Sequence, residues 1–335
     1  MNRVGDYRGA SWWVAPPGSD RERARESPVA EDTPRTEARG PAAAFAWPSV
    51  GGETPVWTGD GFQVGAERRA VVDYDAGASG WSAALTRFHE ETVAGGMHPI
   101  DVASRRRARR SLKRHLHTRR QAPVILEVGC SSGYLLRELA DDWPRSLVIG
   151  SDFIAEPLGR LAGQMPGVPL LRFDMVECPL PSASVDAVVL LNVLEHIEDD
   201  GAAVSQMARV LRPGGIAVVE VPAGPDLYDV YDKYLQHYRR YRLVDLCRLL
   251  ERAGLPVIDR SHLGALLYPA FAVTKKRNQR WLGMPEDVQR RIVQKSITAT
   301  ERSRVMRWAF ALEILGSRWL SYPIGIRCVA VAVKP

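Results

Sequence analysis

The sequence predicts an α/β fold built around a doubly wound parallel sheet. From Pro123 onward, short apolar segments alternate with segments that have the periodicity of amphipathic helices. The apolar segments are continuous, as in strands that are covered on both faces, whereas strands with one exposed face alternate apolar and polar residues. The connections are short, and repeated strand–helix–strand units of this kind bind ligands at the carboxyl ends of their strands.

The expected elements follow one another in order after residue 122. Strands are expected at Val124–Val128, Leu147–Ser151, Pro169–Phe173, Val185–Leu190, Ile216–Val221, Pro256–His262 and Gly325–Val333. Helices are expected at Gly133–Asp141, Glu156–Gln164, Ile197–Leu211 and Leu243–Ala253, and over 285–299 and 301–316. Because the last strand follows a helical segment, we expect it to pair antiparallel with the strand before it.

Composition and apolar periodicity divide the chain into three parts. Residues 1–55 are rich in Pro, Gly, Ala, Arg and Glu without sustained periodicity, which predicts a disordered tail. Residues 56–121 are expected to form an N-terminal helical extension or cap, because Trp81–Glu91 has the apolar spacing of a helix. The main domain is expected over 122–335, with a helical insertion over about 263–320.

Composition limits the class of protein. With 45% hydrophobic and 25% charged residues, the chain is expected to fold as a globular protein. Its 4 cysteines form no C-x-x-C pair and no cluster with histidines, so neither disulfides nor a metal site is expected. No apolar run approaches the roughly 18 residues of a membrane span, and no secretory signal is evident. The cytoplasm is the expected location.

The basic segment 104–120 carries much of the net charge of +6. A basic stripe of this kind can contact nucleic-acid phosphates. However, Ala108, Leu112 and Leu116 recur every fourth residue, which indicates a helix that packs on one side and exposes its arginines to water. No aromatic residue is interleaved for base stacking. We therefore favour the solvated helix face and keep nucleic-acid binding as the alternative.

The most informative motif is Glu127-Val-Gly-Cys-Ser-Ser-Gly133, between an expected strand and an expected helix. A loop of small residues lets the backbone approach a nucleotide-like ligand and directs helix N-terminal amides at it. Asp152 and Asp174 then follow the next two strands, and Asn192 follows the fourth.

In this order, the motifs resemble those of class I S-adenosylmethionine-dependent methyltransferases over residues 123 to about 262, with the last strand also in place. The resemblance implies a Rossmann-like seven-stranded sheet with an antiparallel last strand, S-adenosylmethionine as cofactor, and a small-molecule acceptor bound beside the helical insertion. The Arg-, Ala- and Gly-rich composition resembles that of proteins from high-GC bacteria, in which such enzymes often serve secondary metabolism.

The resemblance also implies the cofactor-binding residues. They are Glu127, Gly129, Cys130, Gly133, Asp152, Phe153, Asp174, Met175 and Asn192. The loop would receive the methionine portion, Asp152 the ribose hydroxyls, and Asp174 and Met175 the adenine edge, with Phe153 on the adenine face. The alternatives are a helix cap for Asp152, a turn for Asp174 and core packing for Phe153.

One position departs from the family pattern. Ser131 stands where the family usually has its middle glycine, and serine is the smallest polar replacement. We expect cofactor binding to survive, and a non-catalytic cofactor-binding scaffold stays open. A nicotinamide-dependent dehydrogenase would need G-x-G-x-x-G spacing, whereas Gly129 and Gly133 are four apart.

His196 and His237 are the candidate general bases, since an imidazole titrates near neutral pH; the alternative is a structural role. The segment Tyr238, Arg239, Arg240, Tyr241 suits an aromatic or anionic acceptor. A nucleic-acid base methyltransferase usually has Asn/Asp-Pro-Pro-aromatic where this chain has Asn192-Val-Leu-Glu. The apolar run Leu263–Val273 is expected to line a pocket or pack the insertion, or to touch a membrane surface with Lys275–Arg277 facing headgroups. The sequence indicates no oligomeric state.

Overall fold

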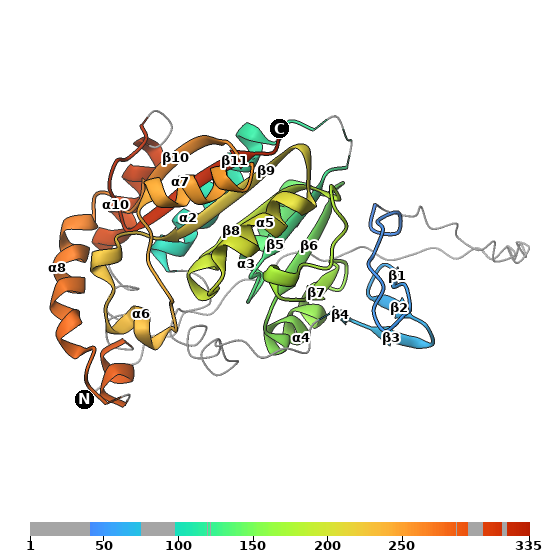
Figure 1. The fold of residues 1–335 in the computed structure, drawn as a ribbon, viewed down its shortest axis with the longest axis horizontal. Coiled ribbons are helices and arrows are strands. Elements are labelled where there is room, and N and C mark those ends of the chain that lie inside the picture. The colour runs from blue at the N-terminus through green and yellow to red at the C-terminus, as the bar shows by residue number, and fades with distance from the viewer. Residues whose placement is uncertain are drawn as a thin grey trace, which may run out of the picture. The chain divides into compact units, whose positions relative to one another are not determined.

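One eight-stranded sheet organises the part of the chain that the structure describes (Figure 1). This computed structural model describes residues 41–74, 98–118, 120, 122–285, 287–293, 304–316 and 320–335. The strands, in sheet order, are β10 (Val257–Leu263), β11 (Arg327–Val333), β9 (Leu211–Pro222), β8 (Val185–Leu191), β5 (Val124–Val128), β6 (Leu147–Asp152), β7 (Leu170–Arg172) and β4 (Val71–Asp73). All neighbours pair parallel except β11, which is antiparallel to both β9 and β10. The predicted α/β fold and antiparallel last strand are confirmed.

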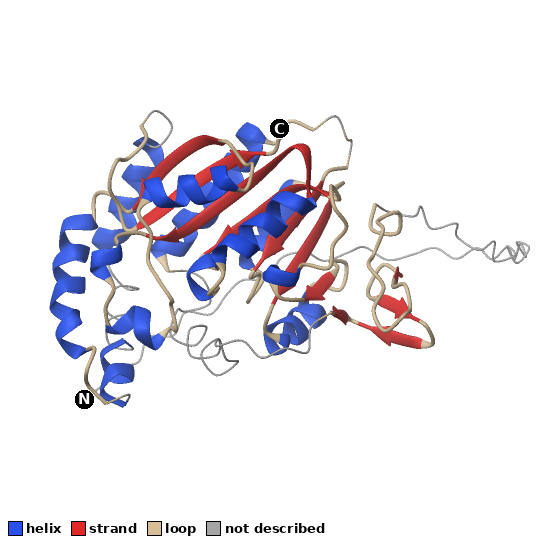
Figure 2. Ribbon diagram, in the orientation of Figure 1, coloured by secondary structure: helices blue, strands red, loops and turns tan. Residues whose placement is uncertain are grey.

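Helices cover both faces of this sheet (Figure 2). They are α2 (Pro99–His115), α3 (Tyr134–Asp142), α4 (Ala155–Gln164), α5 (Asp200–Val210) and α7 (Leu243–Arg252). In β5, Leu126 packs in a core cluster with residues of α5 and α7. The preceding residue, Ile125, packs in a second cluster with residues of α2, α3 and α4. Since successive side chains of a strand point to opposite faces, this explains why the strands are continuously apolar.

The sheet has one strand more than the predicted seven. The extra strand β4 pairs parallel with β7, with Val72 opposite Leu171. Just before it, β1 (Val56–Trp57), β2 (Phe62–Val64) and β3 (Glu67–Arg69) form a small antiparallel sheet. The helical prediction is therefore wrong for residues 56–73, where Phe62 and Val64 are buried and Gln63 between them is only half-buried, a period of two. The helix expected at Trp81–Glu91 lies outside the described residues.

The boundary of the predicted disordered tail also needs correction. Residues 1–40 lie outside the described residues, but 41–55 are described, and Ala42 and Trp47 in this segment are buried in the core. Trp47 is 5% exposed, its ring lies 4.9 Å from that of Phe62, and its Nε1 donates to the Ala42 carbonyl at 2.9 Å. A single buried tryptophan thus anchors a stretch whose Pro- and Gly-rich composition suggested disorder.

The basic helix α2 packs through the predicted apolar stripe, with Ala108 and Leu112 buried. The expectation that its arginines face water is wrong for three of them. The ion pairs are Arg105–Glu138 (3.1 Å), Arg107–Asp259 (3.0 Å) and Arg109–Asp142 (2.5 Å). These charges are neutralised within the fold, on α3 and β10, rather than presented to a polyanion.

The C-terminal insertion contains α8 (Tyr268–Asn278) and α10 (Arg304–Gly316), beside the short α6 (Val230–Tyr234). Leu263 packs with Ile100, Phe310 and Ile326, so this end of the apolar run attaches the insertion to the domain. Lys275 is 6% exposed, which contradicts its expected position facing lipid headgroups. Among the described residues, no helix has the length and apolarity needed to cross a membrane.

Candidate functional site

The loop after β5 has the backbone conformation that the motif requires. Gly129, Ser131 and Gly133 all have positive φ, at 76°, 40° and 71°. The Gly129 and Cys130 amides both donate to the Ser151 carbonyl, at 2.8 and 2.9 Å, which fixes the loop against β6. Ser131 adopts the left-handed region that a glycine would favour, so its presence leaves the shape of the turn intact.

The parallel register brings the ends of four strands to one cavity of about 1080 Å³. Val128 of β5 lies opposite Ser151 of β6 on one side and Leu190 of β8 on the other. Eight of the nine predicted cofactor-binding residues line this cavity: Glu127, Gly129, Cys130, Asp152, Phe153, Asp174, Met175 and Asn192. The sequence motifs therefore converge at the carboxyl edge of the sheet, as the fold class predicts.

Gly133 is the exception, because it is not on the cavity wall. It is the N-cap of α3, and a Cβ at this position would overlap the side chain of Leu161 on α4. The glycine is thus required for helix packing, and its predicted contact with the cofactor is not supported by its position.

Glu127 is the buried acid at the start of the loop. It is 6% exposed, and its Oε2 has no hydrogen-bond partner among the described residues. Burial raises its pKa well above the ordinary value, and the charge of nearby Asp152 raises it further. A cationic group placed against this carboxyl would offset both effects, which fits the ammonium group of S-adenosylmethionine.

Asp152 and Asp174 each organise a local turn as well as facing the cavity. Asp152 accepts from the amides of Ser131 and Ile154, both at 2.9 Å. Asp174 accepts from the Val176 amide at 2.9 Å and caps a short 3-10 helix. The turn suggested for Asp174 is therefore present, whereas the N-cap of α4 is Ile154 and not Asp152. A carboxylate oxygen can accept more than one hydrogen bond, so both side chains can still hold a ligand.

Phe153 lies on the cavity wall with a cation over its ring. The Arg172 guanidinium is 5.6 Å from the ring centroid, and its Nε donates to the Phe153 carbonyl at 2.9 Å. Arg172 also pairs with Asp73 of β4 at 2.9 Å, so the added strand supports this wall.

Arg105 and Tyr134 are wall residues that the sequence interpretation missed. The Arg105 guanidinium lies 5.4 Å from the Tyr134 ring centroid, and both side chains line the cavity beside the glycine loop. In the sequence, the position of Tyr134 directly after the motif is the one signal for this wall, and the pattern around Arg105 predicts a solvated helix face.

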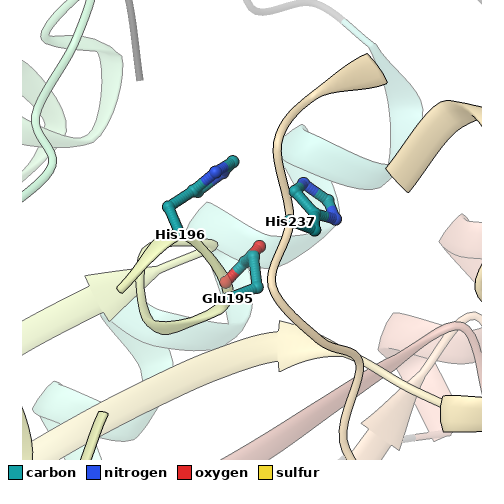
Figure 3. Close-up of side chains that lie close together, drawn as sticks. All are labelled: Glu195, His196 and His237. Carbon is teal, nitrogen blue, oxygen red and sulfur yellow. The ribbon is translucent and has the colours of Figure 1, made fainter. Parts of the chain in front are cut away.

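The two candidate bases are neighbours in the cavity wall. The His196 and His237 ring centroids are 4.6 Å apart, with the rings at 81° (Figure 3). His196 ends a 3-10 helix, Leu194–His196, after β8, and His237 follows α6. The Tyr238 amide donates to the Glu195 carbonyl at 2.8 Å, which ties the two segments together.

Asp232 orients the ring of His237. Its Oδ1 lies 3.0 Å from His237 Nδ1, and burial lowers the pKa of the imidazole. Because a carboxylate can only accept, Nδ1 carries the proton and Nε2 presents a lone pair.

Glu195 is a further buried acid that the sequence interpretation did not select as a site residue. It is 1% exposed, and burial raises its pKa to about 8. Its signal in the sequence was only its position beside His196.

The four predicted acceptor-binding residues separate into two pairs. Tyr238 and Arg240 line the cavity. Arg239 is not on its wall and pairs with Asp200 at 2.8 Å. Tyr241 is 5% exposed within the core, and its hydroxyl hydrogen-bonds to the same Asp200 carboxylate at 2.8 Å. The prediction for Arg239 and Tyr241 is therefore corrected: both hold the segment against α5.

A buried ion cluster joins α6 to α8 at the same wall. Lys275 Nζ lies 2.7 Å from Asp229 Oδ1 and 2.9 Å from Asp232 Oδ2. Arg240 Nη1 lies 2.8 Å from the other Asp232 oxygen, Oδ1. Asp229 and Asp232 also form a capping box at the start of α6. This cluster, comprising Asp229, Asp232, Arg240 and Lys275, fixes the insertion beside the cavity.

The fold is that of a Rossmann-like α/β protein, with a large cavity at the carboxyl ends of its parallel strands. Residues 102–259 match the family model described as a methyltransferase domain. The match covers just under half of the chain and agrees with the resemblance that the sequence motifs predict.

Individual relatives also match part of the chain. A Mycolicibacterium smegmatis protein named "Probable S-adenosylmethionine-dependent methyltransferase" is 38% identical over 137 residues, covering 40% of this chain and 52% of that protein. A trans-aconitate 2-methyltransferase of Azoarcus sp. is 30% identical over 105 residues, covering 31% of this chain and 41% of that protein. The matched region thus spans about half the length of these relatives or less. A solved S-adenosylmethionine-dependent methyltransferase from Archaeoglobus fulgidus is 17% identical, with a TM-score of 0.46, covering 74% of this chain and 99% of that chain.

Proposed function

We propose that the protein transfers a methyl group from S-adenosylmethionine to a small-molecule acceptor. The observation that carries the proposal is the convergence of Glu127, Asp152 and Asp174 with the positive-φ loop on one wall of the cavity. The cavity, at about 1080 Å³, also exceeds the roughly 300–1,000 Å³ of a typical ligand site. It therefore has room for both a cofactor and an acceptor.

Each wall residue has a distinct task in this proposal. The Glu127 carboxyl and the loop backbone hold the methionine portion, and Asp152 holds the ribose. Phe153, Asp174 and Met175 border the adenine. The bound cofactor supplies an electrophilic methyl group on its sulfonium. The chain contributes alignment, since holding two reactants in line can supply much of the acceleration.

The acceptor is proposed to carry an anionic group. Arg240 is 6% exposed on the cavity wall, and its Nη2 has no hydrogen-bond partner among the described residues. A carboxylate or phosphate of the acceptor could accept a hydrogen bond from Arg240 Nη2, while Nη1 stays paired with Asp232. His237 Nε2 or His196 would accept a proton where the acceptor must lose one. The trans-aconitate methyltransferase similarity agrees with a small acid, and we extend this to an acceptor from secondary metabolism.

Nucleic acid is the less supported acceptor. Three arginines of the basic helix are paired with Glu138, Asp142 and Asp259, so part of the charge that motivated this alternative is neutralised within the fold. A non-catalytic scaffold is distinguished from an enzyme only by turnover.

The experiment has two stages. Calorimetry with S-adenosylmethionine and S-adenosylhomocysteine should show one saturable site per chain for each. Methyl-labelled S-adenosylmethionine should then transfer its label into the low-mass fraction of a bacterial metabolite extract, not into precipitated nucleic acid. A folded protein that binds neither ligand would contradict the cofactor assignment, and binding without transfer to any extract would favour the scaffold.

Replacing Asp152 tests the ribose contact. We expect Asp152→Ala to weaken S-adenosylmethionine binding by about 1–3 kcal/mol, because charge-assisted hydrogen bonds to the hydroxyls are lost. Asp141→Ala, an exposed aspartate on α3, should leave binding unchanged. Titration of both variants by calorimetry decides the point, and equal affinities would remove Asp152 from the site.

A further inference from the structure

Three side chains with metal-ligating atoms converge in the cavity wall. Glu195, His196 and His237 each offer one donor atom, and these atoms all lie within 4.8 Å of one another (Figure 3). Two of the residues are adjacent on the segment after β8, and the third comes from the segment after α6. The backbone bond from the Tyr238 amide to the Glu195 carbonyl, 2.8 Å, fixes the two segments in this register.

Two of the three side chains have surroundings that suit a metal ligand. His237 Nδ1 faces the buried Asp232 carboxylate at 3.0 Å, which directs the lone pair of Nε2 away from Asp232. A histidine that binds a metal through one nitrogen commonly donates from the other to a carboxylate. Glu195 is 1% exposed, yet its Oε2 accepts no hydrogen bond from any described residue. A buried carboxylate oxygen without a partner is costly unless a cation or donor completes it.

We propose that Glu195, His196 and His237 bind one divalent first-row transition metal ion, of the class of Zn²⁺, at the wall of the cavity. This site is absent from the sequence-based expectation, which included no metal.

The donor set determines the class of ion. Two imidazole nitrogens and one carboxylate oxygen suit Zn²⁺ and its neighbours, whereas Mg²⁺ prefers oxygen ligands and retains water. Donors on one Zn²⁺, at bond lengths of about 2.0–2.2 Å, lie about 3–4 Å apart. The three atoms already lie within 4.8 Å of one another, so rotation of the side chains can bring them to these separations.

Three protein ligands leave a coordination position open to the cavity. Sites of this composition with a free position hold water or substrate, whereas closed four-ligand sites are structural. We assign the open position to an oxygen atom of the acceptor. This assignment rests on the proposed methyl transfer, and with the metal bound the two imidazoles act as ligands in place of the proton-accepting role proposed above. Metal binding itself does not depend on the proposed function.

The test begins with the full chain, stripped of metal by a chelator and titrated with ZnCl₂, MnCl₂ or MgCl₂ in separate calorimetric runs. We expect one equivalent of Zn²⁺ per chain, with affinity falling in the order Zn²⁺, Mn²⁺, Mg²⁺. X-ray absorption of the Zn²⁺ form should show nitrogen and oxygen ligands and no sulfur, which separates this site from the four cysteines.

Variants locate the ion. Glu195→Gln and His196→Ala should each weaken Zn²⁺ binding by about 100-fold or more, because each removes a direct ligand. His117→Ala removes an exposed histidine outside the cluster and should have no effect. Glu195→Gln preserves side-chain volume, so it keeps the test valid if other variants unfold; circular dichroism verifies the fold.

The outcomes separate the two proposals. Folded protein that binds S-adenosylmethionine but no Zn²⁺ would overturn the metal site and leave the methyltransferase proposal standing. Zn²⁺ binding that is unchanged by Glu195→Gln and His196→Ala would place the ion elsewhere and also overturn it. Zn²⁺ bound as expected without any S-adenosylmethionine affinity would support the site and contradict the proposed function.

Discussion

Gly129→Ala should reduce the affinity for S-adenosylmethionine by about 100-fold, equivalent to about 2.7 kcal/mol. At this position φ is 76°, and a Cβ would lie 2.5 Å from Val193 Cγ2. Side chains in the left-handed region add about 1–2 kcal/mol of strain. The overlap with Val193, itself a cavity residue, must be relieved by moving the loop or that side chain. Either movement disturbs the backbone surface that receives the cofactor.

Gly214→Ala is the matched control for this effect. Gly214 has φ of 78°, almost the same as Gly129, but nothing lies within 4 Å of its Cβ position. Both variants therefore place an alanine at a positive φ, but only Gly129→Ala also places its Cβ against Val193. Calorimetry with S-adenosylmethionine, together with thermal unfolding of each variant, separates the two contributions. Equal affinities in the two variants would show that close approach at Gly129 is not needed for binding.

The sequence predicted the sheet and most of one cavity wall because the responsible signals are local. A buried parallel strand is a continuous apolar run, and a residue such as Asp152 or Asp174 directly follows its strand. The parallel arrangement then brings the strand ends together without further information. For the same reason, the position of Ser131 in a positive-φ turn could be anticipated from the loop motif.

The sequence did not predict features that depend on contacts between distant segments. Arg105 appeared to face solvent because its partner Glu138 belongs to another helix. Strand β4 was missed because three residues, Val71–Asp73, carry too little periodicity to distinguish a strand. The approach of His237 to Glu195 depends on a loop conformation set by Asp232 rather than on spacing along the chain.

Lys275→Met should destabilise the protein by about 3–5 kcal/mol, the largest loss of stability that we expect from a single charge removal. Lys275 is 6% exposed, and it faces Asp229 at 2.7 Å and Asp232 at 2.9 Å, two carboxylates that are fully buried. Arg240 would still pair with Asp232, but Asp229 would lose its ion-pair partner. Methionine has a similar volume, so the cost reports the uncompensated buried charge rather than a cavity.

The neighbouring Lys276→Met provides the comparison at almost the same place in the chain. The Lys276 side chain is 54% exposed; its Nζ donates to the Asp226 carbonyl at 2.8 Å and lies 3.7 Å from the Asp226 carboxylate. Because this pair is exposed to solvent, we expect a change of about 0–1 kcal/mol. Urea unfolding of both variants gives the midpoints and slopes from which the two free energies follow. If Lys275→Met unfolded at the wild-type urea concentration, the buried ion cluster would not be what fixes the insertion to the domain. A loss confined to Lys275→Met would instead show that the buried Lys275 charge stabilises the fold, because the exposed charge of the neighbouring Lys276 would then contribute little.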